Sequence, residues 1–347
     1  MTTQAAQTEQ PLLSVQNLRI RIQMDNGEMN AVDGVDFEIH KGKTLGLVGE
    51  SGCGKSLTSR AIISINPKEC ETTGSIVYHS QSEESLKNLN LLSLNPTSKQ
   101  IRSIRGRKIA MIFQEPMTAF SPMYTIGNQI MEAIQIHRTK NKKEAKKIAL
   151  EMLAKVGISD QEKRFDQYPH EFSGGMRQRA MISMALSCNP ELLIADEPTT
   201  ALDVTIQAQV LELMRGLQAE FGMAILLVTH DLGIIAQMCD EVAVMYLGKI
   251  VEQAPVKEIF YNPKHPYTKG LLKSMPRLGG GKSKRLDSIE GSVPMPINMP
   301  PMCGFFDRCK DRIEGVCNTK VVPSTRISDH HMVKCFLYSD QREGESQ

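Results

Sequence analysis

The segment "GESGCGKS" at residues 49–56 constrains the fold more than any other feature, because it fits the pattern G-x-x-x-x-G-K-[ST]. The apolar run "TLGLVG" precedes it and the helix-like run "KSLTSRAIISI" follows it, so the loop joins a strand to a helix. There, backbone N–H groups and the helix N-terminus can surround phosphates. We therefore expect a phosphate site at Gly49, Glu50, Ser51, Gly52, Cys53, Gly54, Lys55 and Ser56.

Polar residues at the ends of other apolar runs extend this site. Lys55 can reach the β and γ phosphates, and Ser56 can ligate magnesium. The strand-like "LLIADEP" ends in Asp196, which can hold magnesium through water, and in Glu197, which can orient or deprotonate the attacking water. The remaining candidates are Gln114, whose amide oxygen can reach the metal, and His230, whose imidazole can contact a γ-phosphate.

The pattern of apolar runs predicts the fold class. Two alternating segments joined by the turn "DNGE" open the chain and predict antiparallel strands. Later strands alternate with helices, which predicts an α/β fold with a mainly parallel central sheet covered on both faces. The expected strands are 44–49, 109–113, 192–196 and 224–230, and the expected helices include 145–156 and 206–221; residues 78–105 look polar and irregular.

A second phosphate-binding pattern, "FSGGMRQR" at 172–179, places a serine and two glycines beside arginines. Taken in order, the phosphate loop, "FQEP", "FSGGMRQR", "LLIADEP", "ALD" and His230 resemble the ATPase subunits of ATP-binding cassette (ABC) transporters over roughly residues 12–255. The resemblance implies a P-loop NTPase of ABC type that uses ATP and Mg²⁺. A simple phosphate-loop GTPase or kinase has no use for the second pattern.

In this family the second pattern faces the nucleotide of a partner ATPase across a head-to-tail dimer. Ser173, Gly174 and Gly175 would then donate hydrogen bonds to a γ-phosphate held by the other subunit, and Asp203 would lie in the D-loop. The family's adenine-stacking aromatic residue aligns with Ile22, where apolar contact would replace stacking.

The segments "IAMIFQEPMTAFSPMYTIGNQI" and "HPYTKGLL" are similar to the ATPases of oligopeptide and dipeptide importers, in particular to their D-type subunit. This implies three kinds of partner: a second, different ATPase, two transmembrane permease subunits and an extracytoplasmic binding protein. It places the chain at the cytoplasmic face of the inner membrane. The expected domains are a tail (1–11), an ATPase domain (12–260) with a permease-docking helical subdomain (about 116–170), and an extension (261–347).

Four of the eight cysteines lie in that extension: Cys303, Cys309, Cys317 and Cys335, spaced C-x5-C-x7-C-x17-C. Some peptide-importer ATPases hold a four-iron, four-sulfur cluster in such a motif, while tetrahedral zinc and metal-free thiols are the alternatives. His330 and His331 are possible substitute ligands, although we expect exposed structural histidines. "HPYT", "GGGKSKR" and "VPMPINMPPM" suggest a linker, and the remaining cysteines, Cys53, Cys70, Cys188 and Cys239, suggest free thiols.

Composition limits the other function classes. A net charge of +2 in 347 residues gives no general attraction to nucleic acid, so no nucleic-acid partner is expected. Apolar runs such as "AILLV" fall short of the roughly 20 residues that span a bilayer, and the first residues lack a secretory pattern. The alternatives are an importer of oligosaccharides or another small solute, and a soluble ABC ATPase acting on nucleic acid or ribosomes.

Overall fold

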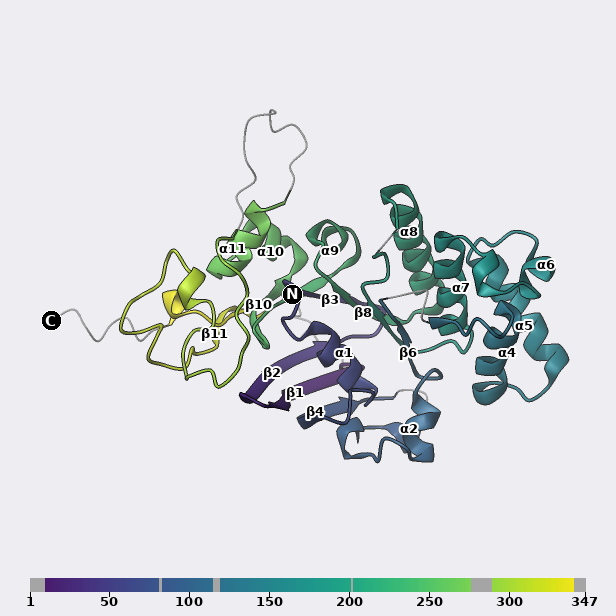
Figure 1. Ribbon diagram of the computed structural model, residues 1–347, viewed down its shortest axis with the longest axis horizontal. Coiled ribbons are helices and arrows are strands. Elements are labelled where there is room, and N and C mark those ends of the chain that lie inside the picture. The colour runs from purple at the N-terminus through teal and green to yellow at the C-terminus, as the bar shows by residue number, and fades with distance from the viewer. Residues whose placement is uncertain (1–9, 81–82, 115–118, 201, 276–288, 340–347) are drawn as a thin grey trace, which may run out of the picture. The chain divides into compact units, whose positions relative to one another are not determined.

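The computed structural model describes residues 10–80, 83–114, 119–200, 202–275 and 289–339 (Figure 1). It forms two compact units. Unit 1 comprises Met1–Val15, Glu38–Thr44 and Ser75–Leu226, and unit 2 comprises Gln16–Phe37, Leu45–Gly74 and Leu227–Gln347. The chain crosses from one unit to the other within β1 (Leu13–Met24), β2 (Gly27–Ile39), β3 (Thr44–Val48), β4 (Cys70–Tyr78) and β8 (Ala224–Thr229).

Unit 1 contains the first part of the α/β core. β6 (Ile109–Ile112) runs parallel to β7 (Leu192–Asp196), with Ile109 opposite Leu192. β7 is buried along its whole length, as its uninterrupted apolar sequence predicts. The end of β4 pairs antiparallel with the short β5 (Leu89–Asn90).

The helices of unit 1 include a group that packs together: α4 (Ile126–His137), α5 (Lys142–Lys155), α6 (Gln161–Phe165) and α7 (Gly174–Leu186) (Figure 1). The predicted apolar stripe of α5 is buried. Its start lies three residues earlier than expected because the Asn141 side chain accepts hydrogen bonds from the first-turn N–H groups. The unit also contains α8 (Val204–Phe221) and α2 (Lys99–Ile104); the latter corrects the irregular structure expected for residues 78–105.

Unit 2 contains a mixed sheet. β3 runs parallel to β9 (Glu241–Tyr246), while β10 (Lys249–Pro255) is antiparallel both to β9 and to β12 (His331–Val333). β11 (Thr325–Ser328) pairs antiparallel with β12. The expected parallel arrangement therefore holds for β3 with β9 and gives way to antiparallel pairing toward β11. The helices are α1 (Lys55–Ile62), α9 (Leu232–Met238), α10 (Val256–Tyr261) and α11 (Pro266–Lys273).

The expected linker is largely structured. "HPYT" begins α11, because Pro266 suits the first helical position and the His265 ring caps the helix by accepting a hydrogen bond from the Tyr267 N–H. The segment "VPMPINMPPM" is bound to β2: the Asn30 N–H donates to the Pro296 carbonyl at 3.1 Å and the Asn298 N–H to the Glu28 carbonyl at 3.0 Å. "GGGKSKR" lies outside the described residues.

Short 3₁₀ turns complete the chain: Glu84–Leu86, Leu91–Ser93, Pro169–Glu171, Phe306–Arg308 and Phe336–Tyr338. Across the part of the chain that the structure describes, no helix combines the length and apolarity needed to cross a membrane.

Candidate nucleotide site

The phosphate loop lies between β3 and α1, as predicted. Two of its glycines, Gly49 and Gly54, lie so close to neighbouring backbone that a side chain would not fit. A Cβ on Gly49 would lie 2.1 Å from the Met245 carbonyl oxygen, which no side chain tolerates. Gly54 has a φ of 94° at the N-terminus of α1, and a Cβ there would lie 2.3 Å from the Ala31 carbonyl oxygen. The backbone of β9 and β2 therefore fixes the shape of the loop.

Lys55 already lies inside the loop. Its side chain is buried, and its Nζ donates to the carbonyl oxygens of Gly49 at 2.8 Å and of Glu50 at 3.0 Å. The neighbouring Cys53 is buried, and burial raises the pKa of its thiol, so this cysteine stays neutral and serves packing. The exposed part of the loop is Ser51 and Gly52, whereas Ser56 is half-buried in the first turn of α1.

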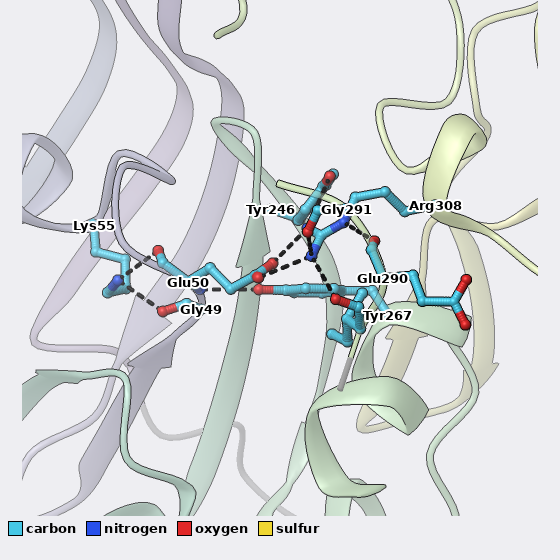
Figure 2. A network of polar contacts seen from close by, with 9 residues as sticks. Gly49, Glu50, Lys55, Tyr246, Tyr267, Glu290, Gly291 and Arg308 are labelled. Carbon is cyan, nitrogen blue, oxygen red and sulfur yellow. Dashed lines mark hydrogen bonds and ion pairs between the residues drawn. The ribbon is translucent and has the colours of Figure 1, made fainter. Parts of the chain in front are cut away.

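Glu50 is held by residues far along the chain (Figure 2). Arg308 makes a two-pronged ion pair with it: Nη1 donates to Oε2 at 2.7 Å and Nη2 donates to Oε1 at 3.0 Å. The Glu50 N–H donates to the Tyr267 hydroxyl at 2.9 Å. Sequence reasoning did not identify Arg308 or Tyr267, because no local pattern reports a contact between positions 258 residues apart.

Unit 1 brings the predicted Gln114 and Glu197 together. The Glu197 Oε2 accepts hydrogen bonds from the Gln114 Nε2 and from the Thr200 Oγ1, each at 2.9 Å. The preceding Asp196 is completely buried at the end of β7. Glu197 itself has a φ of 48°, an uncommon left-handed backbone for a residue with a Cβ. Strained backbone conformations of this kind are common at functional sites, where they set the direction of a side chain.

The second glycine pattern forms the start of α7, also in unit 1. The Ser173 Oγ caps the helix by accepting from the Met176 N–H at 3.2 Å, and Ser173 and Gly174 are exposed. A Cβ on Gly174 would meet no described atom within 4 Å. A Cβ on Gly175 would lie 3.0 Å from Ile206 Cγ2. The described contacts of this chain therefore do not explain why position 174 carries glycine.

α7 and α8 are tied to the segment after β7. The buried Gln178 on α7 donates from Nε2 to the Pro198 carbonyl, one residue beyond Glu197. Asp203 caps α8, because its Oδ1 accepts from the Ile206 N–H at 2.9 Å. The second glycine pattern and the Glu197 segment are thus linked through a buried hydrogen bond.

The remaining predicted site residues lie in unit 2. His230 is exposed and directly follows β8, before the capping residue Asp231 of α9. Ile22 is half-buried on β1. Unit 2 thus holds the phosphate loop, His230 and Ile22, whereas Gln114, Ser173, Asp196, Glu197 and Asp203 belong to unit 1.

The four C-terminal cysteines line one small cavity of about 10 Å³, together with Phe305, Phe306 and Phe336. Burial raises the pKa of Cys303 to about 11 and that of Cys335 to about 12, so these thiols are neutral when unligated. Four thiols around one cavity fit a thiolate-bound group by their chemistry. Among the residues that the structure describes, however, no three side chains of His, Cys, Asp or Glu are arranged to hold a metal ion.

The expectation that both nearby histidines are exposed is wrong for His331. Its ring is buried, and Nε2 lies 2.8 Å from the Glu252 Oε1. The reason is the pairing of β12 with β10, which turns the His331 side chain toward Glu252. His330 is exposed, as expected. His331 is thus committed to a structural pair.

Comparison with known proteins agrees with these motifs. Residues 32–200 match the family "ABC transporter", and residues 251–317 match "Oligopeptide/dipeptide transporter, C-terminal region". The dipeptide transport ATP-binding protein DppD of Bacillus subtilis is 49% identical over 333 residues, which cover 95% of this chain and 96% of DppD. The oligopeptide transport ATP-binding protein AppD of the same organism is 48% identical over 335 residues, or 96% and 99% of the two chains.

Solved structures agree with the fold. CbiO1 of Clostridium perfringens, part of an ABC transporter complex, has a TM-score of 0.60 at 25% identity, covering 73% of this chain and 92% of CbiO1. The cassette MJ0796, a dimer bound to ADP and phosphate, has a TM-score of 0.60 at 24% identity, covering 70% of this chain and 98% of its own. Identity over nearly its full length to DppD and AppD places the chain in the ABC transporter family, among the oligopeptide and dipeptide transport ATP-binding proteins.

Proposed function

We propose that this chain is the ATP-hydrolysing subunit of a peptide importer. The observation that carries the catalytic part is the contact between Gln114 and Glu197 at the end of a buried strand. The peptide substrate class is supported by the relatives named for dipeptide and oligopeptide transport, which match the chain through its C-terminal region. Oligosaccharides or another small solute are the alternative cargo.

In the proposed reaction Glu197 orients or deprotonates the water that attacks the γ-phosphate. Gln114 and Thr200, which donate hydrogen bonds to Glu197, are neutral, so these two hydrogen bonds direct the carboxylate without themselves neutralising it. His230 contacts the γ-phosphate from the end of β8. Lys55 exchanges its loop carbonyl partners for the β and γ phosphates when nucleotide enters.

The donor set for magnesium consists of oxygen atoms, which this hard cation prefers. We assign Ser56, Gln114 and Asp196 to it. The Gln114 amide nitrogen faces Glu197, which leaves the amide oxygen as the atom for the metal. When bound, Mg²⁺ neutralises charge on the phosphates.

The start of α7 serves the nucleotide of a second ATPase subunit. Ser173 and Gly174 are exposed, and the Ser173 hydroxyl, which accepts the Met176 N–H, still has its own proton to donate. Gly175 donates its N–H at the positive end of the helix. The open space around Gly174 suits the close approach of phosphates from outside the chain. Asp203 would lie in the same subunit interface.

The proposed complex contains a second, different ATPase, two permease subunits and an extracytoplasmic binding protein that selects the cargo. The chain would lie at the cytoplasmic face of the inner membrane, with the helical region of about residues 116–170 docked on the permease. We retain 12–260 as the ATPase domain and 261–347 as the extension, and we place adenine against Ile22.

The four cysteines of the extension are proposed to hold a four-iron, four-sulfur cluster, with zinc as the alternative. Support comes from the four thiols that line one cavity. When bound, such a cluster would cross-link the extension and could exchange electrons. Iron, acid-labile sulfide and zinc contents of anaerobically purified protein distinguish the cluster, zinc and metal-free thiols.

The proposed function is tested by purifying the tagged protein from gently solubilised membranes of its native host. Mass spectrometry should identify two multi-spanning permeases and a second ATPase among the co-purifying proteins. The binding protein encoded with them can then be screened against peptides and oligosaccharides. Recovery of the protein with ribosomes or nucleic acid would contradict the importer and favour a soluble ABC ATPase.

A further inference from the structure

Arg308 links the cysteine region to the phosphate loop (Figure 2). It ends the 3₁₀ turn Phe306–Arg308, directly before Cys309, and backbone hydrogen bonds join Cys303 to Phe306 and Phe306 to Cys309. From this anchored turn the guanidinium extends to Glu50, the second residue of the phosphate loop. The phosphate loop and the cysteine motif, far apart in the sequence, thus share a side-chain contact.

The position of the guanidinium is fixed by many partners. Besides its two bonds to Glu50, Arg308 donates from Nε to the Glu290 carbonyl at 3.0 Å and from Nη2 to the Gly291 carbonyl at 3.1 Å. Only 6% of its side chain is exposed. A planar guanidinium bound to both oxygens of a carboxylate sets the orientation as well as the charge balance of the pair.

Glu50 is correspondingly held at three points. Arg308 binds its carboxylate, the Tyr267 hydroxyl accepts its N–H, and its carbonyl oxygen accepts from Lys55. Lys55 is the residue that must turn to the phosphates. The conformation of Glu50 therefore bears directly on where the Lys55 ammonium group lies.

Phe305, the residue directly before this turn, supports Tyr267 by packing. The centroid of the Phe305 ring lies 5.4 Å from that of Tyr267 and 5.2 Å from that of Tyr246, and the Phe305 and Tyr246 rings meet edge-on. The two tyrosine rings lie 4.6 Å apart. Residues 305 and 308 of the extension thus support the phosphate loop twice, once through Tyr267 and once directly through Glu50.

A carboxylate in a phosphate loop needs neutralisation. At an effective dielectric constant of about 20, two negative charges about 8 Å apart repel each other by about 2 kcal/mol. For a carboxylate and a phosphate at that separation, the repulsion corresponds to a loss of roughly 30-fold in nucleotide affinity. An arginine that binds both carboxylate oxygens removes most of this penalty. The cation that does so here is supplied by the extension, outside the loop's own sequence.

We propose that Arg308 is a positioning residue for nucleotide binding: it neutralises Glu50 and holds the phosphate loop in shape, so that the extension is part of the nucleotide site. This inference rests on the proposed ATP-binding function. It gives the extension a role in binding ATP that is separate from any group held by its cysteines.

The test measures binding of a fluorescent ATP analogue to the full chain, together with KM and kcat in the assembled complex. We expect Arg308→Ala to weaken nucleotide affinity about 10-fold to 30-fold and to raise KM, with kcat changed less than about twofold. Arg308→Lys should recover part of the affinity, because it restores the charge without the two-pronged geometry.

Two further measurements of nucleotide affinity distinguish a positioning role of Arg308 from a general disturbance of the fold. Glu50→Gln has an effect of its own, but adding Arg308→Ala to it should cost less than about twofold more, because the arginine acts through the carboxylate. Lys310→Ala removes an exposed cation of the same extension, paired with Glu290, and should leave affinity unchanged.

Equal losses from Arg308→Ala with and without Glu50→Gln would overturn the inference, as would an equal loss from Lys310→Ala. Unchanged affinity in Arg308→Ala would do the same. Failure of the unsubstituted chain to bind the analogue would instead overturn the proposed ATPase function, so the two failures are distinguishable.

Discussion

Two carboxylates in this protein, Glu50 and Glu197, each belong to a nucleotide motif but accept hydrogen bonds from different kinds of donor. Glu50 meets a buried guanidinium, which cancels its charge and fixes its two oxygens. Glu197 accepts hydrogen bonds from the Gln114 amide and the Thr200 hydroxyl, two neutral donors that direct its carboxylate. The comparison teaches that hydrogen-bond donors suit a glutamate to different tasks: a two-pronged guanidinium fixes a carboxylate within a loop, whereas donors such as an amide and a hydroxyl can direct a carboxylate toward a reacting water.

The backbone reinforces this difference. Glu197 has a left-handed φ of 48°, at a cost of about 1 kcal/mol, and the Gln178 contact to Pro198 holds the segment that follows it. Glu50 needs no such strain, because Arg308 and Tyr267 hold it from outside the loop. Strain therefore accompanies the carboxylate that we assign to the attacking water.

The largest expected effect tests the catalytic half of the comparison. Glu197→Gln should lower ATP turnover in the assembled complex by roughly 1,000-fold, because the amide cannot accept a proton from water. Nucleotide affinity should be retained, in contrast to Arg308→Ala. The measurements are steady-state hydrolysis and analogue binding, with the exposed Glu220→Gln as a control. Turnover close to normal would remove Glu197 from its proposed role.

A smaller effect on ATP turnover is expected at Gly174, in the segment of unit 1 that is proposed to bind the nucleotide of another subunit. Gly174→Ala should reduce turnover of the complex about 100-fold, because its methyl group occupies the space proposed for the partner's γ-phosphate. Stability should not fall, since the methyl group meets no described atom within 4 Å. The readouts are hydrolysis and thermal unfolding.

Gly216→Ala on α8 is the matched control, because a Cβ there also meets no described atom within 4 Å. It should raise stability by about 1 kcal/mol through helix propensity and leave turnover unchanged. A loss of ATP binding at this chain's own phosphate loop in Gly174→Ala would contradict the cross-subunit account.

Removing one neutral donor sharpens the comparison further. Thr200→Val keeps the side-chain shape but deletes the hydroxyl that donates to Glu197 at 2.9 Å. We expect kcat to fall roughly 10-fold with KM nearly constant, because a hydrogen bond to a charged group is lost. Thr200→Ser, which retains the hydroxyl, should recover most of the rate. Equal rates for the valine and serine variants would show that the hydroxyl does not direct Glu197.

The smallest effect concerns the support of Glu50. Burial lowers the pKa of His265 to about 3, from an ordinary value of 6.5. Between pH 6.5 and pH 3, His265 is therefore protonated in the unfolded chain but neutral in the folded protein. The resulting stability is present above pH 6.5 and lost as the pH falls toward 3, amounting to about 2 kcal/mol between pH 7.5 and pH 5.

Thermal unfolding at these two pH values checks this prediction. His265→Asn keeps a side chain able to cap α11 but does not titrate, so its unfolding temperature should depend less on pH. The Tyr267 N–H that His265 accepts belongs to the residue whose hydroxyl holds Glu50. The same pH dependence in both proteins would show that other groups cause the acid sensitivity.

Local patterns were enough to predict the strands that precede each site residue. β3, β6, β7 and β8 are short buried apolar runs, and each predicted site residue follows the end of its strand in the sequence. The contact of Gln114 with Glu197 follows from the parallel pairing of β6 and β7, which brings the ends of both strands together.

The features that the sequence did not reveal depend on distant or ambiguous signals. The proline at the start of α11 suits a turn as well as a first helical position, and only the His265 cap decides in favour of a helix over the expected linker. The burial of His331 depends on the pairing of β12 with β10. The Arg308 contact joins residues 258 positions apart, so no window of sequence contains it.

The Arg308–Glu50 pair also limits where this protein can be truncated or joined to a related ATPase in a chimera. A cassette cut after residue 260 would keep Glu50 and lose the cation that neutralises it, so the boundary between cassette and extension is not a boundary of the working nucleotide site. A chimera with a related ATPase would have to transfer positions 50 and 308 together. Among relatives, selection should act on the two positions as one unit, so that a change at either is accompanied by a change at the other.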